Sequence, residues 1–326
     1  MNRYATSKFK VISNAASLAV SLLMCFVSVS AQHLASDHSE HARPSSPAMS
    51  APTQEWAKAR LAKSPRHQEW VSVKHGNRTV SAFVVYPEVK KKATAVIVIH
   101  EINGLTEWVQ GLTDQLAEAG YVAIAPDFLS GMGPNGGGTK ELAAVDRQSV
   151  GQAIRALPPE QVTADLNAVS DYVGSLPASN GKIAVGGFCW GGSQAFRYAT
   201  NNPKLKASFV FYGSAPESKE DLARIKAPVF GFYAGNDARI NATLPATTVA
   251  MKDLKKEFEQ VTYEGAGHAF MRSGEGPPPE PPKVSGGQET EAQAAAAHQK
   301  ALETYKANQK ARDESWVRWK RILSKL

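Results

Sequence analysis

Apolar residues follow two spacings along the chain, and each spacing predicts a type of secondary structure. Two alternating runs, residues 69–75 and 79–86, are separated by Gly76 and Asn77, which is turn chemistry typical of a β-hairpin. Residues 95–99 form a continuous apolar run, as expected for a parallel strand that is buried on both faces. A hairpin followed by a buried strand is therefore predicted.

After that run, strand patterns alternate with helix patterns. Strands are predicted over residues 121–125, 182–185, 207–211, 228–233 and 258–263, and helices over residues 106–119, 158–176, 193–200 and 244–256. The repeated order of strand and helix predicts an α/β fold whose central sheet is mostly parallel, with helices on both faces. A last helix is predicted over residues 289–326.

Three segments interrupt this alternation. Residues 32–68 are rich in His, Ser, Pro and Ala and are predicted to form a flexible N-terminal segment. Residues 130–139 are glycine-rich and predict a mobile loop near the site, whereas the proline-rich residues 276–287 predict an extended insertion. We therefore expect one domain over residues 69–326, which includes this insertion and the C-terminal helix.

Length and charge limit the remaining possibilities. The 326 residues, 43% of them hydrophobic, suit one large domain, although two small ones would also fit. The net charge of +7 gives little support for nucleic-acid binding, because no basic block is interleaved with aromatic residues. His33, His38 and His41 are too loosely spaced for more than weak metal binding. We predict a monomer with no cofactor, no metal and no nucleic-acid partner.

Residues 1–31 have the pattern of a signal peptide. Positive charges occur at Arg3, Lys8 and Lys10. An uncharged, largely apolar stretch follows over residues 11–29, and small residues precede a predicted cleavage after Ala31. The mature chain would then be secreted or periplasmic, without stable membrane insertion. An uncleaved membrane anchor is the alternative, and a lipid anchor on Cys25 is disfavoured because bulky Met24 precedes it.

The chain has two cysteines, and the signal peptide would remove Cys25. Cys189 would then be a lone thiol in an oxidising compartment, where it cannot form an intramolecular disulfide. Such a thiol is either buried and inert, or it has a chemical role.

Cys189 lies in the sequence Gly187-Phe188-Cys189-Trp190-Gly191, between a predicted strand and a predicted helix. Glycines two residues before and after the thiol are required on the strained strand-to-helix turn that carries a nucleophile in α/β-hydrolases. The N-terminus of the following helix would favour the thiolate, and the Trp190 N–H could face an oxyanion. The alternative is an ordinary glycine-rich turn with a buried cysteine.

Candidate partners for Cys189 follow the next strands. Asp237 comes after residues 228–233, and His268 comes after residues 258–263, in the chain order nucleophile, acid, histidine. His268 would accept the thiol proton, and Asp237 would orient and stabilise the imidazolium. Either residue alone could be a polar loop residue, but the order and context together predict an α/β-hydrolase site.

Four motifs now point to a known family. They are residues 99–104 (Ile-His-Glu-Ile-Asn-Gly), 187–192 (Gly-Phe-Cys-Trp-Gly-Gly), 235–237 (Gly-Asn-Asp) and 265–270 (Gly-Ala-Gly-His-Ala-Phe). From about Trp70 to Arg272 the chain resembles the dienelactone hydrolase (carboxymethylenebutenolidase) family. The resemblance implies that Cys189, Asp237 and His268 form a catalytic triad.

The resemblance also implies roles for residues around the triad. Glu101 would contact the resting nucleophile, and the backbone N–H groups of Ile102 and Trp190 would form the oxyanion hole. Arg272 and Arg147 would bind a carboxylate of the substrate. The residues themselves leave alternatives open: Glu101 could cap a turn or pair with an arginine, Arg147 could lie on a solvated helix face, and Arg272 could be structural.

The resulting hypothesis is a hydrolase that cleaves a small lactone or carboxylic ester. A general periplasmic esterase or thioesterase with the same triad is a second possibility. A non-catalytic thiol-sensing or binding protein on the same fold is a third, and the intact set of Cys189, Asp237 and His268 argues against it.

Overall fold

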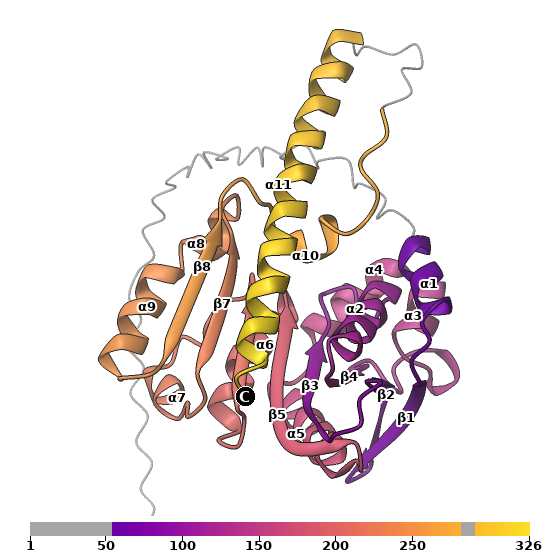
Figure 1. Cartoon of the computed structure of the whole chain (residues 1–326), viewed down its shortest axis with the longest axis vertical. Helices are drawn as coiled ribbons and strands as arrows, with labels where there is room; N and C mark the ends of the chain where they lie inside the picture. Colours follow the sequence, from indigo (N-terminus) through magenta and orange to yellow (C-terminus); the bar gives the residue numbers. More distant parts are fainter. Residues whose placement is uncertain (1–53, 282–290) are drawn as a thin grey trace, which may run out of the picture. The chain divides into compact units, whose positions relative to one another are not determined.

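An eight-stranded sheet runs through the part of the chain described by this computed structural model, residues 54–281 and 291–326 (Figure 1). Its strands are β1 (Gln68–His75), β2 (Arg78–Val85), β3 (Ala93–Ile99), β4 (Val122–Pro126), β5 (Ser179–Phe188), β6 (Ala207–Phe211), β7 (Val229–Ala234) and β8 (Phe258–Tyr263). Their order is β1-β2-β4-β3-β5-β6-β7-β8. Only the β1–β2 and β2–β4 pairs are antiparallel, which confirms the predicted mostly parallel sheet.

The hairpin and the central strand form as their residue patterns predict. His75 pairs with Arg78 across the turn that contains Gly76 and Asn77, and Gly76 has a φ of 50°, which glycine adopts without strain. All seven residues of β3 are buried, because β3 lies between β4 and β5 with helices on both faces.

The helices cover the sheet on both faces (Figure 1). They are α1 (Glu55–Ala62), α2 (Glu107–Glu118), α3 (Thr139–Val145), α4 (Arg147–Arg155), α5 (Pro159–Ser175), α6 (Trp190–Asn201), α7 (Lys219–Ala223), α8 (Ala238–Asn241), α9 (Leu244–Asp253), α10 (Phe270–Ser273) and α11 (Glu291–Leu323). Successive side chains of β3 point to opposite faces of the sheet. Val96 and Val98 pack in the cluster that contains Trp108 of α2 and Trp319 of α11, and Ile97 packs with residues of α5.

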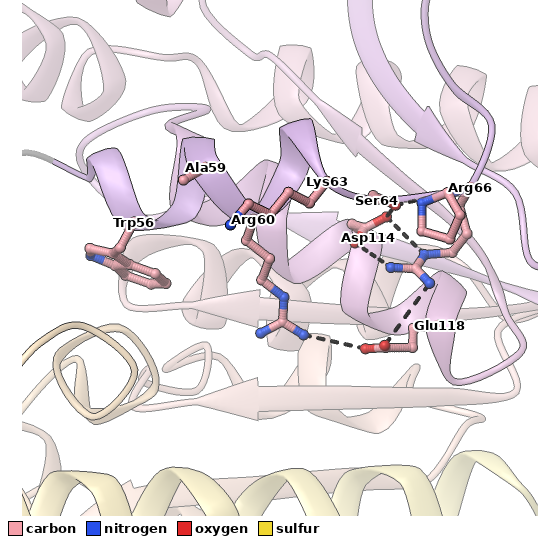
Figure 2. A pocket seen from close by; sticks show the side chains of 9 residues that line it. Trp56, Ala59, Arg60, Lys63, Ser64, Arg66, Asp114 and Glu118 are labelled. Carbon is pink, nitrogen blue, oxygen red and sulfur yellow. Dashed lines mark hydrogen bonds and ion pairs between the residues drawn. The ribbon is translucent and has the colours of Figure 1, made fainter.

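The expectation of a flexible segment over residues 32–68 is wrong for its last part. Residues 55–62 form α1, which buries Ala57 and packs Trp56 against the core. A groove of about 520 Å³ lies between α1 and α2, and Figure 2 shows the side chains that line it. Among them, Arg66 Nη2 lies 2.7 Å from Asp114 Oδ2. This buried ion pair and the packing of α1 hold a segment whose composition suggested no structure. Residues 32–53 lie outside the described part.

The glycine-rich residues 130–139 are anchored at both ends. The Asp127 carboxylate accepts hydrogen bonds from the backbone N–H and the hydroxyl of Thr139, each at 2.7 Å, and Ser130 Oγ donates to the Asp127 carbonyl. Thr139 Oγ1 in turn accepts from the N–H of Leu105, in the loop that follows β3. The segment therefore lies beside that loop, while its mobility stays a prediction.

Other expectations fall on residues outside the described part. The predicted signal peptide, residues 1–31, and the end of the proline-rich insertion, residues 282–287, are among them, so both stay predictions. Within residues 54–281 and 291–326, none of the helices is both long and apolar enough to cross a bilayer.

Candidate active site

The candidate nucleophile occupies a sharp turn between β5 and α6. Cys189 has φ 56° and ψ −116°, a conformation that non-glycine residues rarely adopt, and its side chain is partly exposed. A Cβ atom at Gly187 would overlap the carbonyl oxygen of Gly191, and one at Gly191 would overlap the carbonyl oxygens of Ile99 and His100. Both glycines are therefore required by close backbone contacts, as the motif predicted.

The candidate acid and base follow β7 and β8. Asp237 is 6% exposed, and its Oδ2 accepts a hydrogen bond from His268 Nδ1 at 2.5 Å. Burial opposes a positive charge on His268, but its hydrogen bonds with Cys189 and Asp237 outweigh burial and raise its pKa to about 9. The imidazole thus lies between the thiol and the carboxylate. With this pKa it is an imidazolium, protonated on both ring nitrogens, at neutral pH.

Glu101 follows the central strand and is 3% exposed. Its Oε2 accepts from Arg272 Nε at 2.9 Å, and its Oε1 accepts from the Tyr212 hydroxyl at 3.2 Å. The resemblance placed Glu101 against the resting nucleophile. In this structure its hydrogen bonds go to Arg272 and Tyr212 and not to Cys189, so the alternative that Glu101 pairs with an arginine describes the observed state.

Electrostatics support this arrangement around Glu101. The charge of Glu101 raises the pKa of the Arg272 guanidinium above its usual value, and this attraction outweighs burial, which by itself would lower it. Burial, and next the same charge, raise the pKa of Tyr212 well above its usual range, so the phenol stays a neutral donor. Arg272 therefore has a specific carboxylate partner before any substrate enters.

Tyr212 was missed by sequence reasoning, although a signal was present. It directly follows the predicted strand over residues 207–211, at the same edge of the sheet as Glu101 and Cys189. Its ring packs edge-on against His268, with centroids 5.0 Å apart. Its φ of 42° is a strained backbone conformation for a bulky residue, and such strain is typical of functional sites.

The two candidate oxyanion-hole amides belong to neighbouring turns. Trp190 is the first residue of α6, so its N–H has no acceptor within the helix. Ile102 lies in the turn after β3, and the carbonyl oxygens of Ile99 and His100, just before it, lie against Gly191 in the first turn of α6. The structure therefore places the two segments in direct contact.

Arg147 is not brought into this cluster. It begins α4, and its exposed side chain makes no hydrogen bond or ion pair with the residues that the structure describes. The same helix approaches the site at Gly151, where an added Cβ would lie 3.7 Å from the Ile102 carbonyl oxygen. Its substrate role stays a prediction. In the described ranges no group of three or more His, Cys, Asp or Glu side chains could hold a metal ion.

The mostly parallel sheet, its covering helices and the strained turn after β5 define an α/β-hydrolase. Residues 80–324 match the model of the dienelactone hydrolase family, and the chain belongs to that family. It is accordingly a hydrolase of ester or lactone substrates.

Relatives and solved structures agree with this assignment. A Saccharolobus solfataricus protein named "Putative carboxymethylenebutenolidase" is 33% identical over 229 residues, which cover 59% of this chain and 84% of the relative. A Yersinia pestis protein with the same name is 34% identical over 185 residues, 54% of this chain and 67% of the relative. The crystal structure of a "Putative Dienelactone Hydrolase" from Klebsiella pneumoniae superposes with a TM-score of 0.57 at 26% identity, covering 74% of this chain and 98% of that one.

Proposed function

We propose that this hydrolase cleaves its ester or lactone through a thioester on Cys189, with His268 as acid and base and Asp237 as the group that orients His268. The observation that carries the proposal is geometric: His268 Nδ1 lies 2.5 Å from Asp237 Oδ2, and Cys189 occupies the strained turn at the start of α6. Contacts with Cys189 and Asp237 also raise the pKa of His268 to about 9. A protonated imidazole beside the thiol supports a thiolate nucleophile and provides a proton for the leaving group.

The reaction follows from these positions. Cys189 Sγ attacks the carbonyl carbon, and the N–H groups of Ile102 and Trp190 stabilise the oxyanion. The carbon–oxygen bond of the ester then breaks, and His268 gives its proton to the leaving alkoxide. In the second half, neutral His268 takes a proton from water, which attacks the thioester and releases the acid and the thiolate.

The substrate class follows from the pairing of Arg272 with Glu101. A substrate carboxylate would compete for the Arg272 guanidinium, which binds carboxylates through two parallel hydrogen bonds. Glu101 would then lose its ion pair and be free to move toward Cys189, where it could act on the thiol. We therefore propose a lactone or ester that carries a carboxylate, with Arg147 as a weaker second contact.

The experiment compares a carboxylate-bearing lactone with its neutral analogue. Cys189→Ala should lower kcat/KM for both by roughly 10³-fold or more, since the attacking atom is lost. Retention of a tenth of the wild-type activity would exclude Cys189 as the nucleophile.

Arg272→Ala tests the substrate class in the same assay. It should lower the ratio of kcat/KM for the charged over the neutral lactone by about 10- to 150-fold, since a charge-assisted contact is worth about 1.5–3 kcal/mol. The double variant with Glu101→Gln removes the carboxylate that Arg272→Ala would leave buried and unpaired, and the ratio should stay low. Arg147→Ala is the exposed control and should change the ratio less. An unchanged ratio in the Arg272 variants would favour a general esterase.

A further inference from the structure

The residue before Glu101 is a fully buried histidine that the proposed reaction does not use. His100 is 0% exposed, and burial lowers its pKa, so the ring is neutral. Its Nδ1 lies 2.8 Å from the carbonyl oxygen of Glu101. Because a carbonyl can only accept, the ring proton is on Nδ1, and Nε2 presents a bare lone pair.

That hydrogen bond acts on a catalytically placed peptide group. The carbonyl of Glu101 and the N–H of Ile102 belong to the same planar, trans peptide unit, so they point in opposite directions. The same oxygen also accepts a hydrogen bond from the N–H of Gly104 at 3.1 Å, so the bond from His100 is the shorter of two that hold it. Fixing the oxygen fixes the direction of the Ile102 N–H, which is one candidate donor to the oxyanion.

The same ring contacts the residue that provides the other donor. It stacks on the Trp190 indole with ring centroids 5.5 Å apart and an interplanar angle of 19°. The Phe128 ring closes the cluster edge-on to His100, at 5.3 Å. The backbone carbonyl of His100 also lies against Gly191, in the first turn of α6. One residue thus touches both halves of the candidate oxyanion hole.

The second ring nitrogen of His100, Nε2, indicates why this position holds a histidine and not an apolar ring. Nε2 is buried and has no hydrogen-bond partner anywhere in residues 54–281 and 291–326. A buried polar atom without a partner is unfavourable and calls for an explanation. A phenylalanine ring would provide the same stacking without this penalty, so the polar ring is explained by the bond that its Nδ1 makes.

We propose that His100 is a positioning residue for the oxyanion hole: its Nδ1–H orients the Glu101–Ile102 peptide, and its ring holds Trp190 beside it. The inference rests on the proposed function, because it assumes that the Ile102 and Trp190 amides stabilise the oxyanion. His100 itself touches no reacting atom.

Two substitutions separate the hydrogen bond from the ring. His100→Phe keeps the stacking and removes the donor, so kcat should fall about 10- to 100-fold while KM changes less than about twofold, because orientation acts on the transition state. His100→Asn restores a donor in the place of Nδ1 and should recover part of the loss. Phe128→Leu is the packing control: it removes the other ring against Trp190, and its kcat should change less than about threefold.

A second readout tests the nucleophile without an oxyanion. Reaction of Cys189 with 2,2′-dithiodipyridine forms a mixed disulfide and releases a thiopyridone, so no tetrahedral oxyanion develops. Its rate should be unchanged in His100→Phe within about twofold. Wild-type kcat in His100→Phe, or an equal loss of thiol reactivity and turnover, would overturn the inference. A Cys189→Ala variant that stays active would instead reject the proposed function.

Discussion

The turn that carries Cys189 and the loop that carries His268 are held in place by different kinds of contact. Both follow parallel strands, and both hold a side chain at the carboxyl edge of the sheet. The turn at Cys189 is fixed by backbone atoms of the neighbouring strands, whereas residues 264–275 also depend on contacts with the C-terminal helix. The comparison separates geometry that is built locally from geometry that depends on a remote element.

Backbone contacts leave the turn little freedom. The N–H of Cys189 donates to the carbonyl of Phe211 in the adjacent strand at 3.0 Å. Gly187 and Gly191 lie so close to other backbone atoms that no Cβ would fit at either position. The shape of the turn at Cys189 therefore depends on the central strands themselves.

The His268 loop depends instead on α11, which packs against α10 (Figure 1). Asn308 Oδ1 accepts from the N–H of Gly267 at 2.8 Å, and the backbone of Asn308 approaches Gly274 so closely that a Cβ there would overlap it. Glu275 pairs with Arg312 of the same helix at 3.1 Å. The helix thereby clamps both ends of the segment that carries His268 and Arg272.

The largest effect is expected from Gly191→Ala, which disturbs the close backbone contacts of the turn at Cys189. The added methyl group would overlap the carbonyls of Ile99 and His100, so unfolding free energy should fall by about 3 kcal/mol or more and turnover by more than about 100-fold. Urea unfolding and steady-state kinetics measure both. Gly111→Ala in α2 is the control, because only Ala57 Cβ lies within reach, at 3.9 Å, and stability should change by less than about 1 kcal/mol. Equal effects of the two variants would contradict a turn fixed by backbone contacts.

A smaller effect is expected from Asn308→Ala, which removes the side-chain contact between α11 and the loop that carries His268. The Gly267 N–H would lose its acceptor, which should lower the free energy of unfolding by about 1–3 kcal/mol. Misplacement of His268 should lower kcat by about tenfold. The matched control is Gln309→Ala, an exposed position on the same helix, with an expected change under about 0.5 kcal/mol. A loss of about 1–3 kcal/mol in the free energy of unfolding with unchanged kcat would mean that α11 supports the fold but not the site.

The smallest effect concerns the contact between the two regions, through the charge on His268. Its folded pKa of about 9 exceeds the ordinary value of 6.5, so the stabilisation is fully present below about pH 6.5 and is lost as pH rises through about 9. Because the side chain is 31% exposed, screening reduces the effect to about 1–2 kcal/mol. Urea midpoints at several pH values should show this loss in the wild type and not in His268→Gln. Parallel pH profiles of the two proteins would contradict the raised pKa.

Much of this arrangement was determined by the sequence itself. The predicted strands over residues 207–211 and 258–263 coincide with β6 and β8, and the turn around Cys189 lies where its glycines predicted. Asp237 and His268 also lie in contact, as their order along the chain predicted. Apolar runs, helical spacing and the steric demand for glycine are properties of short segments, so they can be read without knowledge of the fold.

The partners of those segments were decided only by the tertiary structure. Glu101 meets Arg272 from 171 positions away and Tyr212 from 111, because the sheet order places β3, β5 and β6 side by side. The clamp by Asn308 likewise requires α11 to pack beside α10. Such contacts have no local pattern, since each side chain alone is compatible with many partners. Only the packing of the sheet and the C-terminal helix selects among them.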